Sequence, residues 1–130
     1  MRRLFALGVV CFPSFVEADT PTLLTCQFPV GFGYPELNTL NVADQKARLA
    51  DTEGLLHEAR LVGPYPHGEG FKLSVFWRDG FGHESEIVVF SLFESELRYR
   101  VGEVRYDTIS GQRVISSITP FDWINCIESQ

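Results

Sequence analysis

Cysteine is scarce in this sequence, with only Cys11, Cys26 and Cys126 among 130 residues. Neither Cys26 nor Cys126 has a second Cys or a His two to four positions away. That spacing excludes a zinc knuckle, which needs such ligand pairs. We therefore predict no metal site, and no cofactor motif is found either.

Basic charge is also scarce, since 11 Lys and Arg face 17 Asp and Glu and the net charge is −6 at pH 7. A nucleic-acid-binding domain needs a basic footprint. The composition therefore excludes nucleic acid as the expected partner.

Long apolar runs are missing after the N-terminus. The one uncharged run, Leu4 to Phe15, is shorter than the roughly 20 residues that a membrane-spanning helix needs. Arg2-Arg3 precede it and Val16-Glu17-Ala18 follow it, which is the pattern of a secretory signal and its cleavage site. The alternative, an N-terminal core helix, is disfavoured by Pro13. We predict that residues 1–18, with Cys11, are removed and that residues 19–130 form one periplasmic or secreted domain without a transmembrane segment.

Cys26 and Cys126 are expected to form a disulfide, because two cysteines in an oxidising compartment usually pair. Two free buried thiols are the alternative. The bridge would tie the domain shut across nearly its whole length.

The mature chain is divided into strand-length runs by turn residues, and this pattern predicts an all-β fold. Phe71 to Trp77 alternates apolar and polar residues, and Ile87 to Phe93 is apolar on both faces, which favours a central strand with a core on each side. A bulge at Gly102 is expected to shift the alternation of the strand from Leu97, so that Val104 and Tyr106 continue its apolar set. Further strands are expected at 23–28, 114–118 and 123–127.

Residues 41–62 are ambiguous. Their composition favours a helix, but Asp51-Thr52-Glu53-Gly54 interrupts the segment and favours a hairpin of Lys46–Ala50 and Leu55–Val62. The disulfide also requires the first and last strands to lie within about 7 Å. We predict a single small antiparallel barrel of about eight strands; the alternatives are a two-sheet sandwich, or an α+β fold if 41–53 is helical.

Three segments are similar to parts of small exported bacterial β-rich proteins of uncharacterised function: Thr25–Phe28, Lys46–Leu49 and Thr108–Val114. The resemblance implies a β fold with an end-to-end disulfide, and it assigns no active-site residues to this chain. The size and the terminal disulfide also resemble exported inhibitors of C-type lysozyme, whose inhibitory loop has a Ser-Gly-x-x-x-Arg-Tyr character. The segment Val101–Tyr106 keeps Gly102 and Arg105-Tyr106, lacks the serine, and reads as a strand.

Four arginines, Arg98, Arg100, Arg105 and Arg113, are the candidate ligand-facing residues. Together they could receive a carboxylate, a phosphate or a sulfated sugar. The alternative is a solvated sheet face paired with Glu94, Glu96 or Glu103.

Other candidate chemistry is weaker. His57, His67 and His83 each lie near a glutamate, but their predicted positions do not converge, and we interpret them as solvated. The loop Asp79–Glu86 has carboxylates suited to calcium but lacks a second copy, so we interpret it as a turn. No serine lies in a Gly-x-Ser-x-Gly elbow, and no catalytic residue is predicted.

The aromatic content, with 11 Phe, 4 Tyr and 2 Trp, is compatible with a filled core or with an apolar cavity for a small lipid-like molecule, lined by Phe90, Tyr99 and their neighbours. We predict an exported non-enzymatic binding module that engages a protein or envelope partner, with an exposed patch near Phe32–Pro35 or Tyr65-Pro66. The alternatives are a carrier of a small apolar or anionic ligand, a lysozyme-inhibitor-like protein, and a small hydrolase using His67 or His83.

Overall fold

The structure, a computed structural model, describes residues 23–93 and 97–129, so the predicted signal peptide lies outside the described residues, as do Glu94 and Glu96. The described chain contains eight antiparallel strands and no helix, and therefore no helix that could span a membrane. The strands are β2 (Leu23–Gln27), β3 (Leu37–Ala43), β4 (Lys46–Asp51), β5 (Leu56–His67), β6 (Gly70–Arg78), β7 (Glu84–Phe93), β8 (Leu97–Ile109) and β9 (Gln112–Ser129).

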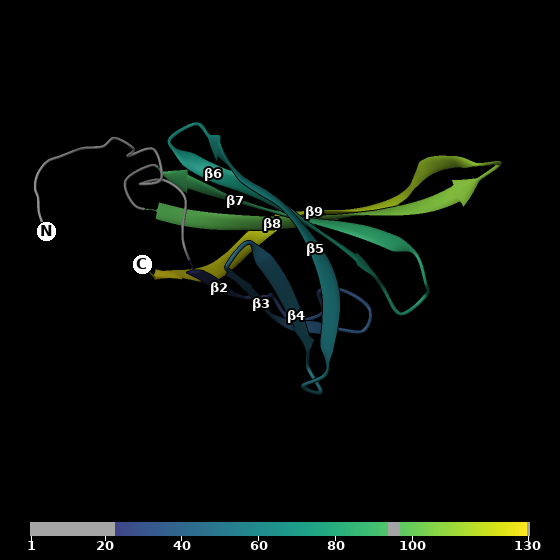
Figure 1. The fold of residues 1–130 in the computed structure, drawn as a ribbon, viewed down its shortest axis with the longest axis horizontal. Helices are drawn as coiled ribbons and strands as arrows, with labels where there is room; N and C mark the ends of the chain where they lie inside the picture. The colour runs from purple at the N-terminus through teal and green to yellow at the C-terminus, as the bar shows by residue number, and fades with distance from the viewer. Residues whose placement is uncertain (1–22, 94–96, 130) are drawn as a thin grey trace, which may run out of the picture.

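Each strand pairs with the next one along the chain, and β2 pairs with β9 to close a barrel (Figure 1). At this seam Cys26 lies directly opposite Cys126, with a Cα–Cα distance of 4.0 Å and a bonded sulfur pair. The predicted barrel and disulfide are therefore confirmed. Antiparallel neighbours need no crossover, so each strand can pair with the strand before it in the sequence.

The core follows the alternation of the strands. Phe71, Leu73, Val75 and Trp77 of β6 are all buried, as predicted, and they face buried residues of β2 to β4 and β7 to β9. A barrel of about eight strands has an interior just wide enough to be filled by side chains. Fully buried residues from six of the eight strands fill it here: Leu24, Leu40, Leu49, Leu73, Val75, Ile87, Val89 and Val101.

Residues 41–53 are not helical, so the α+β alternative is wrong. They form the end of β3, a turn with Asp44 and Gln45 at positive φ, and β4. The predicted hairpin of β4 and β5 is confirmed, although β5 continues beyond Val62 to His67. Strand β3 was not among the predicted strands, and the two strands expected after residue 113 are one strand, β9.

The expected shift of alternation in β8 is wrong. The extra residues lie on β9, which shifts register opposite Val101/Glu103 and opposite Arg105/Tyr106. Strand β8 keeps its own period, so Tyr99, Val101 and Glu103 are buried and Val104 and Tyr106 are half-buried on the outer face. A glutamate therefore occupies a core position.

The outer face of β7 is not a second core. Ile87, Val89 and Ser91 point inward and are buried, whereas Val88 and Phe90 on the other face are only half-buried. The prediction for this strand was correct for one face only.

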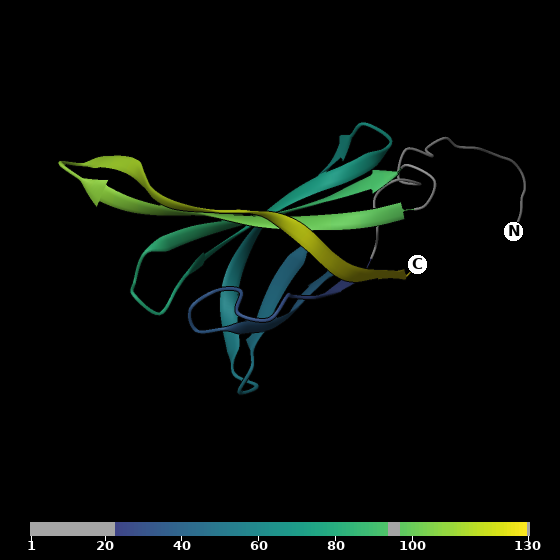
Figure 2. The same cartoon turned by 180° about the vertical axis from the view of Figure 1, so that it is seen from behind.

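The hairpin of β8 and β9 extends away from the rest of the barrel, with its tip at the far end of the molecule (Figures 1 and 2). Strand β9 pairs with β2 only through Asn125–Ser129. Within the described chain, the edge of β9 opposite β8 has no strand partner from Gln112 to Ile124. A long part of β9 is thus left open to solvent.

Candidate functional site

The four candidate arginines do not form one cluster. Arg98, Arg100 and Arg113 lie on the outer face of the β8–β9 sheet, whereas Arg105 lies on the inner side at one end of the barrel. The predicted four-guanidinium site is therefore divided into three separate environments.

Arg98 and Arg100 share one indole. The guanidinium carbons lie 3.6 Å (Arg98) and 5.0 Å (Arg100) from the centre of the Trp123 ring. Arg100 and Trp123 are direct cross-strand partners, which explains the contact. Cation–π stacking of this kind orders a guanidinium without neutralising it. No carboxylate in residues 23–93 or 97–129 forms an ion pair with either arginine.

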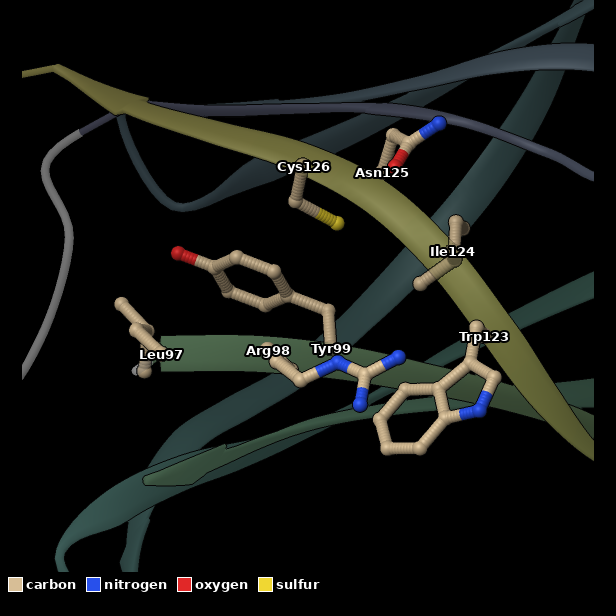
Figure 3. A pocket seen from close by; sticks show the side chains of 7 residues that line it. All are labelled: Leu97, Arg98, Tyr99, Trp123, Ile124, Asn125 and Cys126. Carbon is tan, nitrogen blue, oxygen red and sulfur yellow. The ribbon is translucent and has the colours of Figure 1, made fainter. Parts of the chain in front are cut away.

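A notch of about 290 Å³ opens beside this stack, where β8 and β9 separate beyond the Tyr99–Ile124 pair. Figure 3 shows Tyr99 extending from β8 toward Cys126, and the Arg98 guanidinium beside the Trp123 indole. The Tyr99 hydroxyl donates to Glu128 of β9. Burial, followed by this hydrogen bond to a carboxylate, raises the pKa of Tyr99, so the hydroxyl stays protonated at neutral pH.

Arg113 lies near the tip of the hairpin. It is 3.0 Å from Glu84 and stacks on the Tyr106 ring at 4.0 Å. The Tyr106 hydroxyl donates to Glu86, and burial raises the pKa of Tyr106. This arginine is already paired, with Glu84, which the solvated-face interpretation had not named.

Arg105 belongs to a buried ionic cluster. Its Nε lies 2.8 Å from Oδ2 of Asp79, and its Nη2 lies 3.7 Å from Oε1 of Glu103. Burial raises the pKa of Glu103, although the Arg105 guanidinium and the neighbouring Ser85 and Trp77 oppose this. Glu103 was expected as a cross-strand partner on a solvated face, whereas it lies on the same strand as Arg105 and is buried. Asp79 was not expected as a partner, because it was assigned to a solvent-facing turn.

The Asp79 side chain forms hydrogen bonds within the turn before β7. Its Oδ1 accepts hydrogen bonds from the backbone N–H groups of Phe81 and His83, and its Oδ2 faces Ser85 and Arg105. The carboxylate therefore organises an Asx-type turn, and the interpretation of this loop as a turn holds. Within the parts of the chain that are described, no group of three metal-ligating side chains exists.

The three histidines do not converge. His57 on β5 lies 2.9 Å from the buried Asp51, His67 packs against Phe90, and His83 contacts Asp107. The His57 hydrogen bond is the main reason that the pKa of Asp51 is lowered. Describing His57 as solvated was wrong, because it is half-buried against Trp77.

Of the predicted enzyme geometries, only His83 has a carboxylate within reach. It lies in a groove of about 260 Å³ with Asp107, Tyr106 and Arg113. No hydroxyl or thiol in the described segments is hydrogen-bonded to His83, so the pair lacks a nucleophile. Nothing in the described residues positively indicates an enzyme.

Of the two predicted surface patches, the first is partly buried and the second is exposed. Phe32 is buried and stacks on Phe28, whereas Tyr34 is exposed and stacks on Phe81 of the β6–β7 turn at 4.4 Å. Tyr65 is exposed as expected. Phe90, proposed to line an internal cavity, lies outside the barrel against Phe121.

A row of exposed apolar side chains runs along β9 and was not predicted as a surface. We call it the β9 stripe: Ile115, Ile118, Phe121 and Trp123. These residues oppose Tyr106, Val104, Gly102 and Arg100 of β8, which all lie on the outer face. Each of the two register shifts adds one residue to β9, so Ile115, Ile118 and Phe121 share a face although they are three residues apart. A search of the sequence for strict alternation therefore does not find them.

Val101–Tyr106, compared above with the lysozyme-inhibitor loop, lies within β8 and is no loop. Comparison of the chain with protein-family models, with curated proteins and with solved structures finds no match.

Proposed function

We propose that this protein is an exported, non-catalytic binding module whose protein partner docks on the outer face of the β8–β9 hairpin. The observation that carries the proposal is the β9 stripe, whose four side chains are 41% to 63% exposed on a barrel with a filled interior. Contiguous exposed apolar side chains of this kind mark interaction sites in soluble proteins.

The composition of the surface supports a protein partner. Trp and Arg are the residues most enriched at interface hot spots. Trp123 with Arg98 and Arg100 supplies both in one stack, at one end of the stripe. The stacked guanidinium groups would lose little freedom on binding, which favours affinity.

The partner is expected to contact side chains of β9 and not to pair with its backbone as an added strand. Pro120 lies on the open edge and has no N–H to donate. The two register shifts also interrupt the regular edge that an added strand would need.

A carrier function has less support. The interior positions that would line a cavity are occupied by fully buried aliphatic side chains, and Tyr99 packs against Phe71 at a ring distance of 6.2 Å. Core packing accounts for these residues without a ligand.

The docking proposal is tested by site-specific photo-crosslinking in cells that produce the full chain. A photoreactive residue replaces Ile118 in the stripe or, as a matched control, Arg48, which is exposed on β4 across the barrel. We expect one discrete crosslinked protein from position 118, absent from position 48 and lost when Trp123→Ala is added. Equal crosslinks from both positions, or none from 118, would refute the proposal.

Export is tested separately by the intact mass of the protein recovered from those cells. We expect the mass of residues 19–130 with one disulfide. A mass that includes residues 1–18 would contradict export by signal cleavage while leaving the docking surface untouched.

A further inference from the structure

A groove of about 490 Å³ opens at the end of the barrel nearest the β2–β3 loop. One wall is Pro29–Gly33 of that loop, and the other is Thr119–Asp122 on the open edge of β9. The groove exists because β9 pairs with β2 only from Asn125 onward, so the loop and the strand diverge. Its size lies within the range of small-ligand and side-chain pockets.

The floor of the groove is polar and ionic. Glu103 and Arg105 both line it. Arg105 is directed to Asp79, whose side chain is fully buried, at 2.8 Å. Glu103 lies farther from the same guanidinium, with 3.7 Å between its Oε1 and Nη2 of Arg105.

Glu103 has an unused acceptor. Its residue is 4% exposed, and its Oε2 has no hydrogen-bond partner in the described structure. The Ser85 hydroxyl and the Trp77 indole N–H lie close enough to lower the pKa of Glu103, but neither makes a well-aligned hydrogen bond to Oε2. A buried carboxylate oxygen without a well-aligned donor is costly, and a ligand that supplies such a donor would relieve that cost.

We propose that this groove receives the ammonium or guanidinium group of a lysine or arginine side chain from a protein partner, with Glu103 Oε2 as the acceptor. Asp122 lines the same groove and adds a second negative charge. Since Asp79 and Arg105 neutralise each other, the uncompensated charge is negative. A charge-assisted hydrogen bond to a buried carboxylate is among the strongest that proteins form.

The walls suit the stem of such a side chain. Pro29, Val30 and Pro120 give the rim an apolar surface. Lysine and arginine pack their methylene stems on apolar surface while the charged head finds a polar partner. An anion would meet Glu103 and Asp122, and a metal ion would meet the Arg105 guanidinium, so neither fits as well.

This inference deepens the proposed function, because it names one chemical feature of the partner. The groove borders the residues of β9 that also carry the stripe, so one partner could reach both. Its test uses small probes and no partner. If the probes do not bind, the β9 stripe remains a candidate docking surface. If the crosslinking fails, the groove remains a candidate binding site.

The test is an NMR titration of the oxidised protein with Nα-acetyl-lysine methylamide, the arginine analogue and the uncharged norleucine analogue. The reporter is the indole N–H of Trp77, identified as the signal that remains in Trp123→Phe, since the chain has only two tryptophans. We expect saturable shifts with the lysine and arginine probes and none with norleucine. Glu103→Gln should weaken binding about tenfold or more, because it removes a charge-assisted acceptor.

The matched control is Glu58→Gln, an exposed glutamate on β5 outside the groove, which should bind like the unmodified protein. If Glu103→Gln does not fold, the exposed Asp122→Asn serves instead and should also weaken binding. Equal shifts with norleucine, unchanged affinity in the groove variants, or no saturable shift at tens of millimolar probe would each overturn the proposal. Shifts that depend on protein concentration without probe would assign the groove to a second copy of this chain and overturn it as well.

Discussion

Replacing both Cys26 and Cys126 with alanine should lower the free energy of unfolding by about 4.7 kcal/mol. The bridge joins residues 100 positions apart, and the chain-entropy model gives this value for a closed loop of that length. It acts at the β2–β9 seam, where only five residue pairs close the barrel. Since domains are stable by roughly 5–15 kcal/mol, the variant should retain little stability.

The assay is urea unfolding followed by tryptophan fluorescence, with a thermal scan beside it. The midpoint temperature should fall by roughly 20 °C or more. Reduction of the unmodified protein is the control, because it breaks the bond but leaves both sulfur atoms in place. Agreement between the two measurements would assign the loss to the cross-link and not to the space left by alanine.

A loss below about 1 kcal/mol in both the variant and the reduced protein would refute this reasoning. It would mean that the β2–β9 pairing holds the barrel closed without the bridge, or that the unfolded chain is already compact.

Three further changes test the packing and the buried charges by urea unfolding. Gly70→Ala should cost about 1–3 kcal/mol, because a Cβ there would lie 2.0 Å from Oγ of Ser91 and 2.9 Å from its backbone oxygen; an unchanged midpoint would contradict this. The folded pKa of Glu103 is raised, so its protonated form stabilises the fold below about pH 4.3 and this stabilisation is lost as the pH rises through the raised folded pKa. The free energy of unfolding of Glu103→Gln, measured over the same pH range, should lack that decline. The folded pKa of Asp51 is lowered, chiefly by the hydrogen bond from His57, so the ionised carboxylate stabilises the fold above about pH 3.9 and this stabilisation is lost as the pH falls through the lower folded pKa. Asp51→Asn should remove this loss of stability at acid pH. Identical pH profiles of unfolding for the variant and the unmodified protein would contradict the prediction.

The two candidate surfaces show how far the sequence reaches. Arg98 and Arg100 were identified from the sequence, because alternate positions on a strand share a face. Their stacking on Trp123 was not, since it depends on the cross-strand register of β8 and β9. Arg105 was assigned to the same group, although the unbroken alternation of β8 turns it and Glu103 to the inner side.

The sequence by itself determined the eight-stranded β fold and the pairing of its two mature cysteines, because alternation, turn residues and compartment are local or compositional signals. Only the tertiary structure decided which strand edge stays open and which acidic side chain enters the core. The register shifts in β9 and the early end of its pairing with β2 are properties of two strands together. No single stretch of sequence contains them, and they create both the β9 stripe and the groove above Glu103.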